Sequence, residues 1–294
     1  TIPSGITLNA APGANILFDK EVGISVHGQL QALGTASQPI TFMSYDKLAD
    51  GKWSGIFATE AGRIHLSYAT VRQTGDLGIA SGSPQASLRI ENSLFTDNFF
   101  PISLIATSLH LLQMDNVTFR NNDHNIVLIA VEGNDHLGNN VTLTPQTGLD
   151  GYFFADYASS GEPNLIIPTG IALDATPNTK LLFDKDLRII VQGQLQATGT
   201  VESNITFTTY DKLSDGDWSG ILIEDAGHVH LSHATVQQTS LEAVASNSLQ
   251  SSLFIENSLL TNNFFPSSLR STNLHLLEMN NVTFRNNHYN MVLI

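Results

Sequence analysis

Five aspartates gather in two copies of a glycine-containing bend, and they are the strongest candidates for binding a cation. They are Asp46 and Asp50 in the first copy and Asp211, Asp215 and Asp217 in the second. Calcium takes about six to eight oxygen ligands, which carboxylates and carbonyls in a tight turn supply. The spacing does not match an EF-hand loop, so a polar turn without an ion is the alternative. Calcium is the one candidate cofactor, and no other is expected.

A pair of carboxylates is the arrangement that glycoside hydrolases use, and Glu91 and Asp115 are the best pair in this chain. They lie 24 residues apart, a spacing that predicts stacking on one outer face. The second copy has Glu256 and Asn280 at the same places, so it lacks one of the two carboxylates. A catalytic role would leave at least one complete set of residues, and none is found. We therefore expect no catalytic residues and no enzyme.

Histidine and tryptophan each recur once per copy. His65 and His230 occupy the same outward position, and no second type of metal ligand stacks on them, so we expect histidines that face solvent. Trp53 and Trp218 lie in the sequence W-S-G-I. A sugar platform is one interpretation, but the adjacent Gly55 favours a tryptophan that covers a bend over the core.

Four Asn-x-Ser/Thr sequons are candidates for glycosylation. They are Asn116, Asn140, Asn204 and Asn281. Asn116 and Asn281 are equivalent between the copies and also belong to an expected stack of asparagines, so they carry no glycan if they point inward. Asn140 lies in a predicted loop over residues 132–140 and is the best of the four.

Short strands must position these residues, and two columns of apolar residues, each spaced by 24, predict such strands. The positions between the two columns are mostly polar, which indicates strands with one buried face. The columns are Ile16, Ile40, Ile64, Leu88 and Leu112, and then Phe18, Phe42, Leu66, Ile90 and Met114. A third column reads Val71, Phe95, Phe119 and Leu143. The pattern predicts an all-β parallel β-helix with about 24 residues and three short strands per rung.

Side chains that recur every 24 residues should stack on one another. Asparagines in register form hydrogen-bonded ladders, and phenylalanines form aromatic stacks. The expected stacks are Asn92 with Asn116, Asn98 with Asn122 following Thr74, and Phe95 with Phe119. Residues 74–87 are rich in glycine and serine and are expected to form a longer loop.

A larger repeat divides the chain into three parts. Shifted by 165 residues, the sequence matches itself without a gap at roughly 60% of positions, which marks a tandem repeat. The parts are a first β-helix repeat (1–129), an intervening segment that continues the coil with loops (130–165) and a second repeat (166–294). Since the second copy stops where the first gives way to the intervening segment, we expect a window from a longer array.

Composition excludes several classes of partner. Among 294 residues, 27 are acidic and 13 basic, for a net charge of -14, which argues against nucleic acid and anionic membranes. There is no cysteine, hence no disulfide framework or thiolate metal site. No run of 18 apolar residues occurs, so no membrane span is expected.

The motifs N-S-L-F-T-D-N, N-V-T-F-R-N-N, G-Q-L-Q-A-L-G-T and W-S-G-I resemble right-handed parallel β-helix proteins of the pectin-lyase-like superfold. They are most similar to its non-catalytic secreted and surface members. The resemblance implies an extracellular or cell-surface segment of a filament, stalk or adhesin, whose partners are stacked copies or adjacent repeats, with glycans as further partners. A carbohydrate-binding or lyase-like carbohydrate-degrading β-helix is the alternative, and a trimeric receptor binder is a third.

Overall fold

The computed structural model describes residues 1–45, 52–157, 163–211, 213, 216–269, 276–290 and 292–293. Regular structure in this part of the chain consists of 34 strands and one short 3-10 helix, η1 (Ala106–Leu111). No described helix is long and apolar enough to cross a membrane. The chain divides into two compact units, one of residues 1–129 with 146–150 and the other of residues 130–145 with 151–294.

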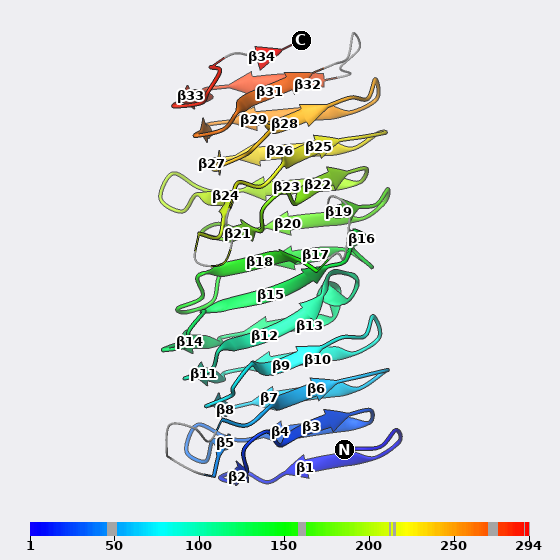
Figure 1. Ribbon diagram of the computed structural model, residues 1–294, viewed down its shortest axis with the longest axis vertical. Helices are drawn as coiled ribbons and strands as arrows, with labels where there is room; N and C mark the ends of the chain where they lie inside the picture. Colours follow the sequence, from blue (N-terminus) through cyan, green and yellow to red (C-terminus); the bar gives the residue numbers. More distant parts are fainter. Residues whose placement is uncertain are drawn as a thin grey trace. The chain divides into compact units, whose positions relative to one another are not determined.

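The first unit consists of three parallel sheets in which strands three apart in chain order are neighbours (Figure 1). Sheet 1 contains β1 (Thr7–Ala10), β4 (Gln29–Leu33), β7 (Arg63–Ser67), β10 (Ser87–Glu91) and β13 (Leu112–Asp115). Sheet 2 contains β2 (Asn15–Phe18), β5 (Ile40–Ser44), β8 (Ala69–Arg72), β11 (Leu94–Thr96) and β14 (Thr118–Arg120). Sheet 3 contains β3 (Gly23–Val26), β6 (Gly55–Ala58), β9 (Leu77–Ser81), β12 (Phe100–Ile105) and β15 (Ile126–Val131).

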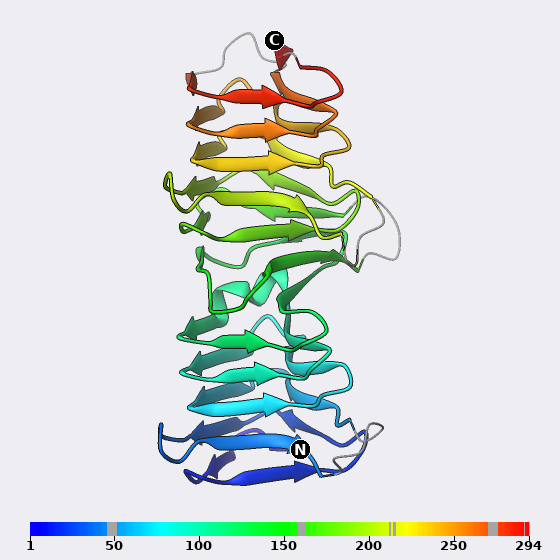
Figure 2. The same ribbon diagram turned by 90° about the vertical axis from the view of Figure 1, so that its left-hand side faces the viewer.

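The second unit repeats this order, and its strands again lie in successive layers (Figure 2). Its sheet 1 contains β17 (Val141–Leu143), β20 (Ala172–Ala175), β23 (Gln194–Thr198), β26 (His228–Ser232), β29 (Ser252–Glu256) and β32 (Leu276–Asn280). Its sheet 2 contains β18 (Gly151–Asp156), β21 (Lys180–Phe183), β24 (Ile205–Thr209), β27 (Ala234–Gln237), β30 (Leu259–Thr261) and β33 (Thr283–Arg285). Its sheet 3 contains β16 (Asn134–His136), β19 (Asn164–Ile167), β22 (Arg188–Val191), β25 (Gly220–Ile223), β28 (Glu242–Ser246), β31 (Phe265–Leu269) and β34 (Val292–Leu293).

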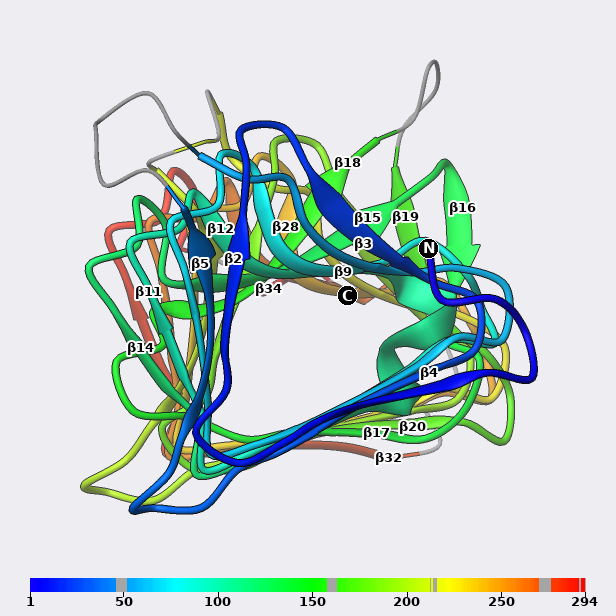
Figure 3. The ribbon, with the colours of Figure 1, turned by 90° about the horizontal axis from the view of Figure 1, so that it is seen from below.

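The core of the first unit lies between its three sheets, which face inward from three sides (Figure 3). Sheet 2 places Phe42, Val71, Phe95 and Phe119 in register, all almost completely buried. The rings of Phe95 and Phe119 stack with centroids 5.6 Å apart, which confirms the predicted aromatic stack. Alternate residues of each strand therefore supply a continuous apolar interior, as expected for strands with one buried face.

The prediction that the first apolar residues form one column is wrong for its first two members. Ile64 pairs with Leu88, and Leu88 with Leu112, as predicted. Ile16 and Ile40, however, lie in sheet 2, and the strand that pairs with Ile64 on its other side contributes Leu30 instead. The reason is that β5 ends at Ser44 and β6 begins only at Gly55, so more residues separate these two strands than separate the strands that follow in this unit. A uniform step of 24 therefore holds only for part of the unit.

The predicted end of the phenylalanine column and two predicted loops also differ from the observed structure. Leu143 does not continue the phenylalanine column, because it pairs with Ala175 in sheet 1 of the second unit. The predicted loop over residues 74–87 contains the buried strand β9, and the predicted loop over 132–140 contains β16. The intervening segment does contribute strands, but Val141 and Leu143 lie on a different sheet from the one that their 24-residue spacing predicts.

Bends between strands use single residues in the left-handed backbone conformation, and they recur 165 positions later. Asn92 has φ 48° and its counterpart Asn257 also has φ 48°. Further pairs are Tyr68 with His233, Asn116 with Asn281, Asp97 with Asn262, Asn121 with Asn286, Glu60 with Asp225 and Glu21 with Asp186. Asparagine and aspartate tolerate this conformation better than other non-glycine residues, which explains why they predominate here.

Tyr152 gives a prediction about alkaline stability. Its ring is buried, its hydroxyl donates to the Thr144 carbonyl at 2.7 Å, and burial raises its pKa to about 12. The folded state thus holds the phenolic proton more tightly than the unfolded state, whose pKa is about 10. This contribution is complete below about pH 10 and decreases as pH rises towards 12, by about 2 to 3 kcal/mol.

The measurement is urea unfolding between pH 9 and pH 12, compared with the variant Tyr152→Phe. The wild type should lose stability over this range more steeply than the variant, because only the wild type has a buried phenol to ionise. Parallel curves for the two proteins would contradict the prediction, since the two proteins differ only at residue 152.

Candidate functional site

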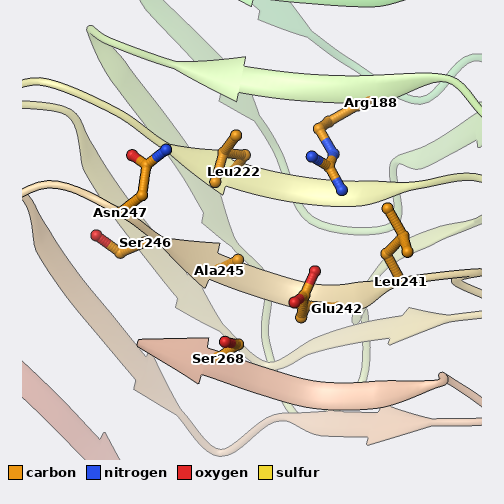
Figure 4. Close-up of a pocket in the computed structure, with 8 residues that line it drawn as sticks. All are labelled: Arg188, Leu222, Leu241, Glu242, Ala245, Ser246, Asn247 and Ser268. Atoms are coloured by element: carbon orange, nitrogen blue, oxygen red, sulfur yellow. The ribbon is translucent and has the colours of Figure 1, made fainter. Parts of the chain in front are cut away.

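A groove of about 280 Å³ lies on the outward side of sheet 3 in the second unit (Figure 4). Its lining comes from β22, β25, β28 and β31 and from the residues flanking β28. Leu222, Ala245 and Ser268 are paired in register across three of these strands. Ala245 and Ser268 have much shorter side chains than Leu222, and this difference leaves the hollow.

One positive and one negative side chain approach the groove from opposite strands. Arg188 on β22 and Glu242 on β28 extend towards β25, which runs between them (Figure 4). The residue of β25 that pairs with Arg188 is Gly220, which has no side chain. A Cβ atom on Gly220 would lie 1.9 Å from the carbonyl oxygen of Glu242, and its φ is +85°. Only glycine fits there, so the space between the two charges stays open.

Neither charge is neutralised within the described part of the chain, where no ion pair involves Arg188 or Glu242. An arginine binds carboxylates and phosphates through two parallel hydrogen bonds, and a carboxylate accepts hydrogen bonds from hydroxyl or amino groups. Leu222 and Leu241 add apolar surface beside them. The groove is therefore suited to a polar ligand with an apolar face. It offers one carboxylate, whereas hydrolysis of a glycoside uses two.

The first unit has an equivalent row of residues without the charges. Its equivalent row is Phe57, Ala80 and Ser103, again paired in register. Gly23 stands at the position of Arg188, and Leu77 at the position of Glu242. The charged groove therefore belongs to one copy only.

Comparison with family models, curated proteins and solved structures finds no match. The predicted cation site is in part outside the described residues, where Asp46, Asp50 and Asp215 fall. Asp211 accepts a hydrogen bond from the Gln238 amide at 3.2 Å. Burial raises the pKa of Asp217, and the negative charge of Asp211 raises it further. No group of three or more His, Cys, Asp or Glu residues in the described part could hold a metal ion, so calcium remains a prediction.

The carboxylate pair stacks as predicted but is engaged elsewhere. Glu91 is in register with Asp115, and Glu256 with Asn280. The Arg89 side chain donates to Glu91 at 2.7 Å and holds the pKa of that carboxyl below its usual range. A carboxylate kept ionised in this way is poorly suited to act as a general acid.

The tryptophans are structural, which excludes a sugar platform on their rings. Trp53 and Trp218 are both 0% exposed. Trp53 stacks on Phe18 with ring centroids 4.2 Å apart, and its indole N–H donates to the Arg72 carbonyl at 2.7 Å. The second copy repeats the arrangement, as Trp218 stacks on Phe183 at 4.2 Å. The interpretation that tryptophan covers a bend over the core is confirmed.

All four sequon asparagines are exposed. The Asn116 amide donates to the Asn92 side chain at 2.8 Å, so the predicted stack forms, but on the outside of the corner. The Asn140 side chain accepts a hydrogen bond from the backbone of Ala172 at 2.9 Å. Glycosylation of Asn116, Asn140, Asn204 and Asn281 remains a prediction.

The charged groove was not predicted from the sequence. Its one signal is the difference between the copies, where Gly23 and Leu77 become Arg188 and Glu242. Because these residues are 54 positions apart in chain order, only the strand register brings them to one groove.

Proposed function

We propose that this chain is a structural segment of an extracellular filament, stalk or adhesin, built as a right-handed parallel β-helix of tandem 165-residue units. In this proposal the fold is of the pectin-lyase-like type, and its partners are further copies or adjacent repeats. The observation that carries it is a buried hydrogen-bond ladder that recurs in both units with the same geometry.

In the first unit the ladder joins three successive layers at one corner. The Asn98 side-chain oxygen accepts from the Thr74 backbone N–H at 3.2 Å and from the Thr74 hydroxyl at 3.0 Å. The Asn98 amide donates to the Val71 carbonyl and to the Asn122 side-chain oxygen, each at 3.0 Å. Asn98 is 1% exposed, so these bonds satisfy polar groups that water does not reach.

The second unit repeats the ladder. Asn263 accepts from the Thr239 backbone N–H at 3.2 Å and from its hydroxyl at 3.1 Å. Its amide donates to the Val236 carbonyl at 3.0 Å, and its backbone N–H donates to Asn287 at 3.0 Å. The internal supports are thus retained between the copies, whereas Arg188 and Glu242 in the groove are not. Retention of these supports, when the charged groove is not retained, favours a scaffold.

Electron microscopy and sedimentation of the purified chain over a wide concentration range test the proposal. We expect particles that associate with one another as concentration rises, because parallel strands at the edge of a sheet can pair with another chain. Dispersed monomers at every concentration would count against self-stacking. A sharply defined trimer would favour the receptor-binding alternative instead.

Carbohydrate binding is the second candidate, and the groove between Arg188 and Glu242 is the observation that favours it. Oligosaccharides with and without carboxylate groups should be titrated against the wild type, Arg188→Ala and Glu242→Gln. Weakening of binding by about tenfold in both variants, with Arg63→Ala as an unaffected control, would support it. Ultraviolet absorbance from unsaturated products would reveal the degrading version.

A further inference from the structure

A histidine and a glutamate meet on the outward side of sheet 1 in both units. In the first, His65 Nε2 on β7 lies 3.7 Å from a carboxylate oxygen of Glu91 on β10. In the second, His230 Nε2 lies 3.5 Å from a carboxylate oxygen of Glu256. No second type of metal ligand stacks in register on these histidines, as expected, but each glutamate reaches its histidine from a different register position. Glu91 pairs in register with Ser67, two residues after His65, so the contact is diagonal.

The separation within each pair is wider than a hydrogen bond but close to that of two ligands of one metal ion. His65 Nε2 is inaccessible to solvent and has no hydrogen-bond partner in the described structure. A tetrahedral metal ion lies about 2.1 Å from an imidazole nitrogen and about 2.1 Å from a carboxylate oxygen. The nitrogen and the oxygen are then about 3.4 Å from each other. The distances of 3.5 and 3.7 Å need only a small adjustment of the side chains to reach this value.

A glutamine stands beside each histidine on the neighbouring strand. Gln31 is in register with His65, and Gln196 with His230. The Gln196 amide nitrogen donates to Gln194 at 3.3 Å, which leaves its carbonyl oxygen as the atom suited to a cation. A third oxygen ligand of this kind is compatible with a tetrahedral ion whose last position is taken by water or by a partner's group.

The three residue types recur although their surroundings change. Between the copies Arg63 becomes His228 and Arg89 becomes Phe254, whereas the glutamine, the histidine and the glutamate are the same. These side chains face outward from the sheet, so packing of the core does not explain their retention. Retained polar residues on a surface indicate binding rather than folding.

We propose that each unit binds one divalent transition-metal ion, of the zinc, copper or nickel type, between His65 and Glu91 and between His230 and Glu256. Imidazole suits these metals, whereas calcium prefers oxygen ligands, so the site differs in chemistry from the aspartate-rich bend. No group of three or more His, Cys, Asp or Glu residues in the described part could hold a metal ion, so the proposed site needs the glutamine carbonyl as its third ligand.

The two proposed metal sites differ in the residue that stands beside the glutamate, and this difference predicts different affinities. The Arg89 guanidinium contacts Glu91 at 2.5 Å and competes with an ion for that carboxylate. In the second unit Phe254 stands at the position of Arg89 and carries no charge. The site at His230 should therefore bind the ion more tightly than the site at His65, and Arg89→Phe should strengthen the first site.

Calorimetry with Zn²⁺ and paramagnetic resonance with Cu²⁺, on the full chain without an affinity tag, test the proposal. We expect two ions per chain, imidazole nitrogen coupled to Cu²⁺, one ion for His65→Ala and none for His65→Ala/His230→Ala. Glu91→Gln should weaken the first site about tenfold or more. His136→Ala, at an exposed histidine on β16, is the matched control and should retain both ions.

The proposal is overturned if the double histidine variant binds as many ions as the wild type, or if the wild type binds none at 1 mM Zn²⁺. It is also overturned if the control His136→Ala loses an ion while His65→Ala does not. Circular dichroism of each variant checks the fold, and because these side chains lie on the outward face of the sheet, outside the core, we expect unchanged spectra. The tests do not depend on whether the chain forms filaments.

Discussion

Replacing Asn98 by alanine is expected to lower the free energy of unfolding by about 3 to 5 kcal/mol, because it leaves several buried polar groups without partners. The variant removes the acceptor for the Thr74 N–H and hydroxyl and the donor to the Val71 carbonyl. Each orphaned buried group costs about 1 to 3 kcal/mol. Urea unfolding followed by circular dichroism measures the change.

Two variants make this prediction specific. Asn98→Asp keeps the oxygen that accepts from Thr74 but loses the amide that donates to Val71, so it should also destabilise the chain, and more strongly at neutral pH, where the buried carboxylate is ionised. Asn15→Ala, at an exposed asparagine on β2, should change the free energy by less than about 0.5 kcal/mol. If Asn98→Ala were as mild as Asn15→Ala, the ladder would not be a support.

The ladders were predictable from sequence, whereas the register of the first layers was not. Asn98 and Asn122 are separated by 24 residues and lie on consecutive layers. Ile16 and Ile40 are also separated by 24 residues, but their strands do not place them in one column. A fixed spacing reports a shared position only where the intervening bends are of constant length. Apolar residues occur on all three sheets, so they do not reveal a slip from one sheet to another.

The bends were only partly predictable for a related reason. Asn92 and Asn116 suit a left-handed conformation, so their recurrence marked a corner. Tyr68 and Glu60 adopt the same conformation at φ 47° and 53°, although their residue types do not signal it. The surrounding strand pairing imposes the bend there, and pairing between distant segments is not visible in a local pattern.

The surface sites depend even more on tertiary register. The His65–Glu91 contact is diagonal across two strands, so the search for ligands at the same position in successive layers missed it. Arg188 and Glu242 line one groove because the strand register places Gly220, which has no side chain, between them. The residue types were visible in the sequence, but the partner of each was set by which strand follows which around the sheets.

Replacing Trp53 by alanine is expected to cost about 3 to 5 kcal/mol of stability, the range found when a buried aromatic side chain is truncated. Trp53 is fully buried and parallel to Phe18, with an interplanar angle of 6°. Its removal leaves a cavity beside Phe18 and an unpaired carbonyl at Arg72. The intrinsic fluorescence of Trp218, the one remaining tryptophan, then reports unfolding of the second unit separately.

Trp53→Phe separates packing from hydrogen bonding, since it keeps a ring against Phe18 but has no N–H for the Arg72 carbonyl. It should cost about 1 to 3 kcal/mol, less than the alanine variant. Trp218→Ala is the matched variant in the second unit, where the indole N–H donates to the Gln237 carbonyl at 2.8 Å. Costs below about 1 kcal/mol for both alanine variants would contradict the structural role. Because both indoles are buried, added oligosaccharides should leave the tryptophan emission of the wild type unchanged.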